Sequence, residues 1–348
     1  SPPGSLAMSE VPALMRACVV REHGDADTAL KIETDFPAPT LSEGNVIVKN
    51  TFAGLNFIDT YHRKGLYPRE LPFVAGQEGG GTIVATSPEA EAAGWAVGQT
   101  VTYIAFGSYA EYTSVPASKC VTVPEGLDLD VAVACMVQGL TAHYLVSSAH
   151  ADLIKKGEWM LIYSVGSGTC QWAAQMAKLR GYKVIGTTSK GKFDVAKDIG
   201  CDELIVLDTA EGKTYAEYKS VDIAAKVNEI TGGAGCKCII DGVGASTYEI
   251  SLACLARRGI FISFGNASGS VPAFPVLRLT GKSTFVTRPK LGDYIADPNE
   301  LADRCSDIFN WLKEGRLKVG IDRTFALEAA VDGHNYLEQG KSKGKVVY

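Results

Sequence analysis

The chain has 348 residues, enough for two domains, and 46% of them are hydrophobic, enough to fill a core in each. Its net charge of −5 comes from acidic and basic residues interspersed along the chain, without a basic block that would neutralise a phosphate backbone. Nucleic acid is therefore not the expected partner. We also find no apolar run approaching the roughly 20 residues that span a bilayer, so no membrane insertion is expected.

Nine cysteines are scattered along the chain, and only Cys236 and Cys238 are close together. Their alternation in "CKCIID" predicts two core positions on one face of a strand rather than a metal or redox site. This use of cysteine fits a reducing compartment, and we expect a cytoplasmic protein. The opening "SPPGSLA" lacks the apolar centre of a signal peptide and is interpreted as a cloning remnant or flexible extension.

From Arg16 to Val123 the sequence consists of short strand-like segments separated by Gly, Pro, Asn and Ser turns. This pattern predicts an irregular antiparallel domain. The segments are "RACVV", "NVIVKNTFAG", "GGTIVAT", "QTVTYIAF" and "YAEYTSV".

From about Leu140 strands and helices alternate. The run "WMLIYSV" is typical of a buried parallel strand, and "CQWAAQMAKLRG" has a helical pattern that ends in glycine. Further units follow, including a predicted helix over "TYEISLACLARRG" and a strand over "GIFISFGN". This alternation predicts an α/β fold with a doubly wound parallel sheet. The segment from "NELADRCSDIFNWLKEGRL" to "KVVY" predicts a helix, a strand, a helix and a strand that return to the first domain.

The stretch "SVGSGTC" at 164–170 turns the first parallel strand into its helix, where ligands of such sheets bind. Small side chains let backbone N–H groups approach a pyrophosphate, and a helix N-terminus favours the anion. Gln171 stands where the third glycine of a dinucleotide fingerprint would be. The context predicts a phosphate-facing turn, with a tight turn that binds nothing as the alternative.

The second strand ends in "GTTSKGK", without the carboxylate that would accept a ribose 2′-OH. Ser189, Lys190 and Lys192 offer a hydroxyl and two ammonium groups, which suit a 2′-phosphate. We therefore predict NADPH as the cofactor. The alternative is a solvated loop that is basic by chance.

Several segments together resemble one family: "GLNFIDTYHRKGLYPRELPFVAGQEGGGTI", "YAEYTSVPASKCVTVP", "QGLTAHYL", "LARRGIFISFGNASG", "VTRP" and "GKVV". They are similar to the zinc-free quinone oxidoreductases, the zeta-crystallin-like branch of the medium-chain dehydrogenase/reductase superfamily. The resemblance implies a GroES-like catalytic domain, residues 1–139 and 290–348, around a Rossmann NADPH-binding domain, residues 140–289. It also implies a homodimer joined through the edge strands of the two Rossmann sheets.

No metal is expected. In zinc-bearing relatives a cysteine and a histidine stand where this chain has Asn56 and Gln77, and neither amide is a competent zinc ligand beside a lone Glu78. We interpret Glu78 as an internally paired residue of a glycine-rich bend.

Without a metal, neutral donors must steady the oxygen that gains charge during hydride transfer. The resemblance places Asn56 and Tyr61 near the nicotinamide and its ribose, and Tyr67 in the acceptor pocket. These three residues are the predicted catalytic group; Tyr61 is either a hydrogen-bond donor or an aromatic wall. Asp59 is expected to be a buried structural acceptor rather than a base. The predicted cofactor contacts are Asn56, Tyr61, Thr141, Gly166, Ser167, Gly168, Thr169, Ser189, Lys190, Lys192, Val243, Gly244, Phe264, Gly265, Asn266, Ala267, Thr287, Arg288 and Lys345.

Two departures from the family predict weak cofactor binding. The family's glycine positions hold Ser167 and Cys170, and a tyrosine that relatives offer near the 2′-phosphate falls at Asp208, whose charge would oppose that phosphate. The predicted function is an NADPH-dependent quinone oxidoreductase. The alternatives are a reductase of activated C=C bonds in enals or enones, and an NADPH-bound structural or RNA-binding crystallin-like protein.

Overall fold

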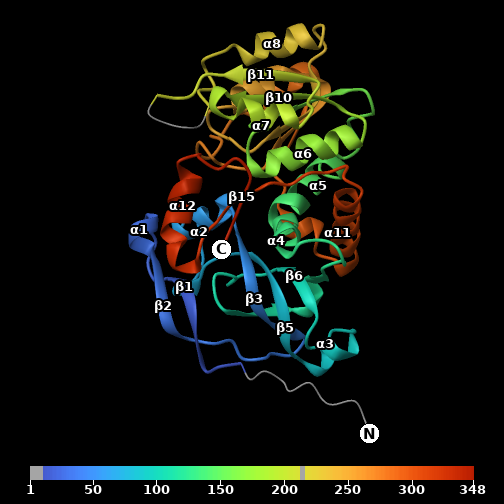
Figure 1. Cartoon of the computed structure of the whole chain (residues 1–348). Coiled ribbons are helices and arrows are strands. Elements are labelled where there is room, and N and C mark those ends of the chain that lie inside the picture. The colour runs from blue at the N-terminus through green and yellow to red at the C-terminus, as the bar shows by residue number, and fades with distance from the viewer. Residues whose placement is uncertain (1–10, 212–215) are drawn as a thin grey trace.

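A computed structural model describes residues 11–211 and 216–348; the N-terminal extension considered above lies outside them. In Figure 1 the parallel sheet and its helices form the upper part, and the antiparallel strands form the lower part. The red C-terminal segment lies beside the blue and cyan strands of the lower part. The two parts confirm the predicted combination of a Rossmann-type sheet with a GroES-like β domain.

Six parallel strands form the upper sheet in the order β11-β10-β9-β12-β13-β14. The chain runs from β9 outwards to β11 and then crosses to β12 on the other side of β9, so the strand order reverses between β9 and β12. This confirms the doubly wound sheet. In such sheets ligands bind beyond the carboxyl ends of the strands, at the point where the strand order reverses. The strands are β9 (Trp159–Ile162), β10 (Lys183–Ser189), β11 (Glu203–Leu207), β12 (Cys236–Asp241), β13 (Leu255–Ser263) and β14 (Phe285–Thr287).

Helices cover both faces of this sheet, which is why the centres of its strands are apolar. Met160 and Ile162 of β9 face a core that includes side chains of α5 (Leu140–Ser147), α6 (Gly168–Leu179) and α11 (Pro298–Lys313). Leu161 faces the opposite core, with α8 (Ile223–Ile230) and α9 (Tyr248–Cys254).

Seven strands form the larger sheet of the lower part, in the order β15-β16-β3-β5-β6-β8, with β7 paired to β3. The C-terminal β16 pairs antiparallel with β3, which confirms that the end of the chain returns to the first domain. A smaller sheet has the order β2-β1-β4. The strands are β1 (Leu14–Val20), β2 (Leu30–Pro37), β3 (Asn45–Leu55), β4 (Phe73–Val74), β5 (Glu78–Thr86), β6 (Thr100–Ile104), β7 (Tyr112–Pro116), β8 (Cys120–Thr122), β15 (Ile321–Thr324) and β16 (Lys345–Val347).

Shorter helices and turns connect these elements. The α-helices are α1 (Ala26–Ala29), α2 (Phe57–Arg63), α3 (Pro88–Ala92), α4 (Leu129–Ala134), α7 (Phe193–Asp198), α10 (Leu291–Tyr294) and α12 (Ala330–Glu338). A π-helical turn is η2 (Cys135–Gly139), and 3-10 turns are η1 (Ala117–Lys119), η3 (Lys190–Lys192), η4 (Val276–Lys282) and η5 (Leu327–Ala329).

Two local predictions were wrong. The helix predicted through "LARRG" ends at Cys254, and Leu255 already belongs to β13, because pairing with Cys236 and burial outweigh its helical propensity. Cys236 and Cys238 are both fully buried, as predicted for core positions, but they contact opposite cores. The register between β12 and β13 shifts between them, so the simple alternation fails.

The described residues contain a long apolar helical run that the sequence analysis did not predict. Residues Leu129–Ser147, which combine α4, η2 and α5, form 19 helical residues with a mean hydropathy of 1.4, long and apolar enough to cross a membrane. In the structure 72% of this segment is buried, and it packs against α6 and α11. It is the kind of helix that fills a protein core.

Candidate active site

Helix α2 follows β3 directly and begins the site. Asn56 precedes the helix, and its backbone N–H donates to Asp59 Oδ2 at 2.8 Å, an arrangement that stabilises a helix N-terminus. Both side chains are buried. The local sequence therefore fixes Asn56 in the interior at the start of α2, while Tyr61 lies near its end.

A buried ion pair joins Lys345 of β16 to Glu78 of β5, and neither side chain is exposed. Asn56 connects the two: its Nδ2 donates to Glu78 Oε1 at 2.7 Å, and its Oδ1 accepts from Lys345 Nζ at 2.8 Å. Lys345 Nζ also donates to the backbone oxygen of Leu55 at 3.1 Å. The expected internal pairing of Glu78 is confirmed. The Lys345 ammonium is held by oxygens of Leu55, Asn56 and Glu78.

Glu78 also holds the π-helical turn η2, since its Oε2 accepts the backbone N–H of Val137 at 2.5 Å. Gln138 of the same turn packs against Gly168, where a Cβ would lie 2.8 Å from Gln138 Nε2. Gln138 Oε1 is buried and has no hydrogen-bond partner among the residues that the structure describes. Sequence reasoning did not single out Gln138, although it begins the quoted "QGLTAHYL"; its unsatisfied oxygen marks it as a further candidate contact.

The residues around Glu78 do not fit a zinc ion. Asn56 and Gln77 present amides, and the Glu78 carboxylate is already paired with an ammonium group. Within residues 11–211 and 216–348, no three His, Cys, Asp or Glu side chains are grouped so that they could hold a metal. The positive charge at this point of the fold is that of Lys345.

Asp59 has the contacts of a buried structural acceptor. Its Oδ2 accepts from Tyr109 Oη at 2.9 Å and from the Asn56 N–H, while its Oδ1 has no partner within residues 11–211 and 216–348. Burial raises the pKa of Asp59 to about 7, against the lowering effect of the Asn56 and Tyr109 donors.

Replacing Asp59 with Asn is expected to remove a pH-dependent loss of stability. The folded state keeps a proton on Asp59 up to about pH 7, whereas the unfolded chain releases it near pH 4, so stability falls as pH rises between these values. Melting temperatures from pH 5 to 8 check this in both proteins. His143 and His334, whose pKa values are lowered by burial, lower stability on acidification in both proteins alike, so the difference curve isolates Asp59. A difference curve without slope would contradict the prediction.

The loop after α2 meets the segments that follow β13 and β14. Tyr67 Oη lies 3.1 Å from Arg288 Nη2 and 3.2 Å from the amide of Asn266. Because Arg288 can only donate, the amide orientation that turns the Asn266 oxygen towards Arg288 and Tyr67 satisfies all three groups. Arg288 also donates to the backbone oxygens of Ser263 at 2.9 Å and Gly265 at 3.0 Å.

Tyr61 lies in the same cluster, with its ring edge-on to Tyr67 at a centroid distance of 5.4 Å. Burial raises the pKa of Tyr61, and the backbone of Asn266 lowers it less strongly, so the phenol is protonated at neutral pH. The structure thus brings Tyr61, Tyr67, Asn266 and Arg288 together between the two parts of the chain.

The turn after β9 is compact. Ser164 has a φ of 58°, its Oγ lies 2.5 Å from Tyr218 Oη, and Val165 N–H donates to Thr187 O at 2.9 Å. A Cβ on Gly166 would lie 2.8 Å from Lys192 Cβ, so close packing alone requires glycine there. Ser167 precedes α6 without capping it through its side chain, and the first N–H groups of this helix remain available to an anion.

Cys170 stands at the position predicted to correspond to the last glycine of the family's turn. Its side chain is 6% exposed, lies in the core with α6, and has a pKa raised to about 12 by burial. The thiol is therefore a packing group of the core.

The end of β10 carries the residues predicted for a 2′-phosphate. Ser189 is buried, and the exposed Lys190 forms an ion pair with Asp208, which follows β11. The charge of Asp208 is therefore paired with the neighbouring Lys190 ammonium, and its position near a 2′-phosphate stays a prediction. Burial lowers the pKa of Lys192 to about 8, with Lys343 adding to the decrease and Asp322 opposing it.

The loops after β12 and β13 are locked together. Asp241 accepts from Val243 N–H at 2.8 Å and Gly244 N–H at 3.1 Å, and Ala267 N–H donates to Gly242 O at 3.2 Å. Gly244 has a φ of 92°, which requires glycine, and a Cβ on Gly265 would overlap the Gly242 backbone. The remaining predicted contacts are half-buried and lie on α5, α6, the β13 loop and β14: Thr141, Thr169, Phe264 and Thr287.

These features define a class: an oxidoreductase of the medium-chain dehydrogenase/reductase fold, in which a Rossmann-type sheet is combined with a GroES-like domain. The sequence model of the alcohol dehydrogenase GroES-like domain matches residues 42–125, and that of the zinc-binding dehydrogenases matches residues 206–347. The second match is to a family named for zinc, whereas residues 11–211 and 216–348 contain no group of His, Cys, Asp or Glu side chains that could hold a metal. The chain belongs to the quinone oxidoreductase family of this superfamily.

The relatives support this membership over nearly the whole chain. The quinone oxidoreductase of Pseudomonas aeruginosa is 36% identical, over 87% of this chain and 90% of its own. The 2-haloacrylate reductase of a Burkholderia species is 32% identical, over 96% and 98%. Among solved structures, the Escherichia coli quinone oxidoreductase complexed with NADPH is 31% identical with a TM-score of 0.86, covering 95% of this chain and 99% of that one.

Proposed function

We propose that this chain is an NADPH-dependent quinone oxidoreductase that works without a metal. The observation that carries the proposal is the meeting of Tyr61 and Tyr67 with Asn266 and Arg288, which follow the carboxyl ends of β13 and β14. Structures of relatives in complex with NADPH, including the E. coli enzyme and a mycobacterial protein, support the same cofactor.

The chain's own residues fit such a cofactor. The glycine turn and the free N–H groups of α6 suit a pyrophosphate, and Ser189 with Lys190 and Lys192 suits a 2′-phosphate. When bound, NADPH supplies the hydride. Arg288 holds Tyr67 and the β13 loop in place, and the protonated Tyr61 can donate to an acceptor oxygen that gains charge.

The assay that tests this function follows oxidation of NADPH by the purified protein with 1,2-naphthoquinone and 1,4-benzoquinone. If neither quinone is reduced at NADPH concentrations where fluorescence shows that NADPH is bound, the proposal is overturned. Reduction of activated C=C bonds is the second candidate, because Tyr61 offers the proton that this reaction needs and relatives include 2-haloacrylate and prostaglandin reductases.

Changing Tyr61 to Phe distinguishes the two reactions. A quinone takes up its protons from solvent after hydride transfer, so we expect turnover of quinones to fall less than about fivefold. Reduction of an enone needs a proton at carbon or oxygen, and its kcat is expected to fall about 10²-fold. Steady-state kinetics with both acceptors give the ratio. Unchanged turnover of both acceptors would assign Tyr61 to packing, and equal large losses would assign it a donor role in both reactions.

Changing Asp208 to Asn is expected to tighten NADPH binding about three- to fivefold, because it frees the Lys190 ammonium and removes a charge that opposes the 2′-phosphate. Fluorescence titration measures the change, and NADH, which lacks that phosphate, serves as the control. An equal gain for NADH would place Asp208 away from the 2′-phosphate.

We propose a homodimer joined along β14, the edge strand of the parallel sheet. Phe285 and Val286 of this strand are 43% and 37% exposed, and Val276 and Leu277 of the neighbouring η4 are 77% and 79% exposed. Unpaired apolar edges of this kind are usually covered. Sedimentation equilibrium tests the proposal, and a monomer at micromolar concentration would refute it.

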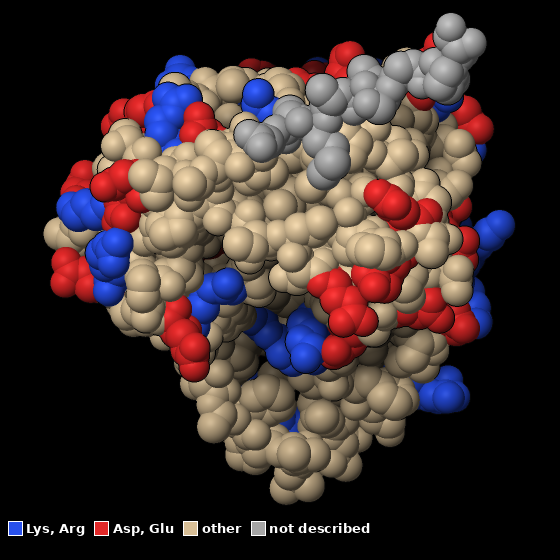
Figure 2. Space-filling view, turned by 90° about the horizontal axis from the view of Figure 1, so that it is seen from below, with Lys and Arg blue, Asp and Glu red and all other residues tan. Residues whose placement is uncertain are grey.

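We propose domain boundaries at 139/140 and 289/290, supported by the separate membership of the two large sheets. The nine free cysteines, eight of them buried, support a reducing location such as the cytoplasm. On the face in Figure 2, Lys and Arg stand among Asp and Glu, with a few basic side chains gathered in a hollow. That mixture favours a small-molecule enzyme over an RNA-binding protein.

A further inference from the structure

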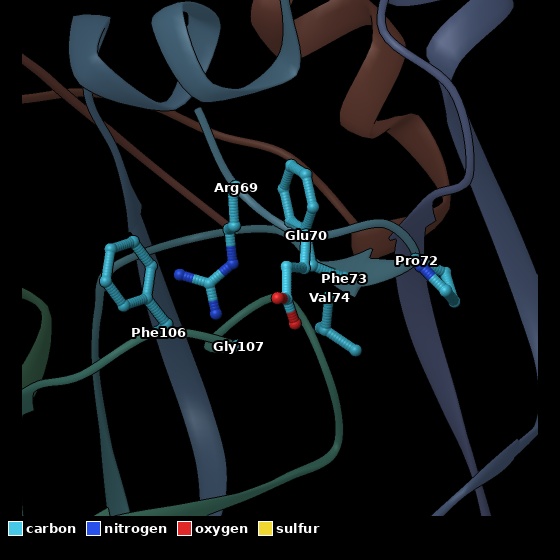
Figure 3. A pocket seen from close by; sticks show the side chains of 7 residues that line it. All are labelled: Arg69, Glu70, Pro72, Phe73, Val74, Phe106 and Gly107. Carbon is cyan, nitrogen blue, oxygen red and sulfur yellow. The ribbon is translucent and has the colours of Figure 1, made fainter. Parts of the chain in front are cut away.

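A pocket beside the proposed active site has no assigned role. It has a volume of about 520 Å³ and opens between the segment before β4 and the loop after β6 (Figure 3). Arg69, Glu70, Phe73 and Phe106 line it. In Figure 3 the Arg69 guanidinium extends into the space between the Phe106 ring and the Glu70 side chain.

The Arg69 guanidinium is held by aromatic rings rather than by an acid. Its Cζ lies 3.7 Å from the centroid of Phe106 and 5.3 Å from that of Phe73. Among the described residues it makes no ion pair of 4.0 Å or less, and burial alone shifts its pKa, which is lowered. A half-buried cation stacked on two rings, with its N–H groups still available, is a receptor for a planar anion.

A row of contacting aromatic rings lies between the pocket and Tyr67 of the proposed active site. His62 packs edge-on against Phe106 at 5.4 Å and against Tyr67 at 5.8 Å, and Tyr67 in turn contacts Arg288. A small inner cavity shares Phe73 and Phe106 with the pocket and is also lined by His62 of α2. The same row of contacting rings therefore leads from Tyr67 to Phe106, on which Arg69 stacks.

We propose that this pocket is the outer part of the acceptor site and that Arg69 determines specificity by binding an anionic substituent, a carboxylate or sulfonate, of an aromatic acceptor. The inference rests on the proposed function, because it concerns the acceptor of that same site. Glu70, on the other side of the pocket, repels the same substituent and limits its affinity.

The test compares 1,2-naphthoquinone-4-sulfonate with neutral 1,2-naphthoquinone. For Arg69→Gln we expect the ratio of kcat/KM, sulfonate over neutral, to fall about tenfold, the loss expected for a charge-assisted hydrogen bond. Arg69→Lys keeps the charge and is expected to retain part of the ratio, and Glu70→Gln is expected to raise it. Arg257→Gln, which changes the net charge equally on the exposed part of β13, is the matched control. A ratio unchanged in Arg69→Gln, or changed equally in Arg257→Gln, would overturn the proposal.

A binding measurement separates this inference from the proposed function. Naphthalene-2-sulfonate cannot be reduced, and its binding to the whole protein is measured by calorimetry in the wild type and Arg69→Gln. If the wild type reduces no quinone yet binds this probe about tenfold more tightly than Arg69→Gln, the function fails and the anion site stands. Equal affinity of the two proteins would refute the anion site whatever the enzyme reduces.

Discussion

Replacing Lys345 with Met is expected to lower the free energy of unfolding by about 3–5 kcal/mol, because it leaves the Glu78 carboxylate buried without its countercharge. Asn56 loses the donor that holds its Oδ1, so kcat is expected to fall as well if Asn56 contacts the nicotinamide ribose. Urea unfolding at pH 7.5, followed by tryptophan fluorescence, measures the stability change.

Two further variants make the interpretation specific. The double variant Glu78→Gln/Lys345→Met removes both charges and is expected to recover most of the stability, since breaking a buried pair costs far more than replacing it. Lys226→Met, on the exposed side of α8, is the control and is expected to change stability by less than about 0.5 kcal/mol. A loss below about 1 kcal/mol in Lys345→Met would show that water reaches the pair.

The ion pair also shows why local sequence predicts a fold better than it predicts a site. The hydrophobic periodicity of each segment indicates whether it is a strand or a helix, so the doubly wound sheet and the returning C-terminal strands were predictable. The internal pairing of Glu78 was predictable too, because no metal ligands surround it. Its partner was not, since Lys345 is 267 residues away and meets it only when β16 pairs with β3.

Other features depended on details that sequence patterns do not carry. Cys236 and Cys238 contact opposite cores because of one register shift, which no alternation rule contains. The ion pair between Lys190 and Asp208 joins the ends of two neighbouring parallel strands, and the pattern predicted both positions but not their contact. The sequence did not point to Arg69, because its stacking on Phe106 depends on a loop that is distant along the chain.

The affinity for NADPH is expected to fall about tenfold between pH 7 and pH 9 because of Lys192. This residue packs directly on the glycine turn, where a Cβ at Gly166 would lie 2.8 Å from its own Cβ. Its pKa of about 8 means that much of the ammonium is neutral at pH 9, and a bound phosphate would restore the proton. Binding then takes up a proton, and above the pKa each pH unit costs up to a factor of ten.

Fluorescence titrations of NADPH from pH 6.5 to 9.5 test this coupling, with Lys192→Gln as the paired variant. The variant is expected to bind about tenfold more weakly at pH 7 and to show no dependence between pH 7 and 9. Asp322 and Lys343, the charged groups that act on Lys192, remain in both proteins and so cancel in the comparison. A pH dependence confined to NADPH would assign Lys192 to the 2′-phosphate, and one shared with NADH would assign it to the pyrophosphate. Parallel profiles for the wild type and Lys192→Gln would show that the Lys192 ammonium contacts no phosphate of the cofactor. NADPH would then be bound at the turn without this charge, and the weak binding predicted from Ser167 and Cys170 would be expected for both proteins.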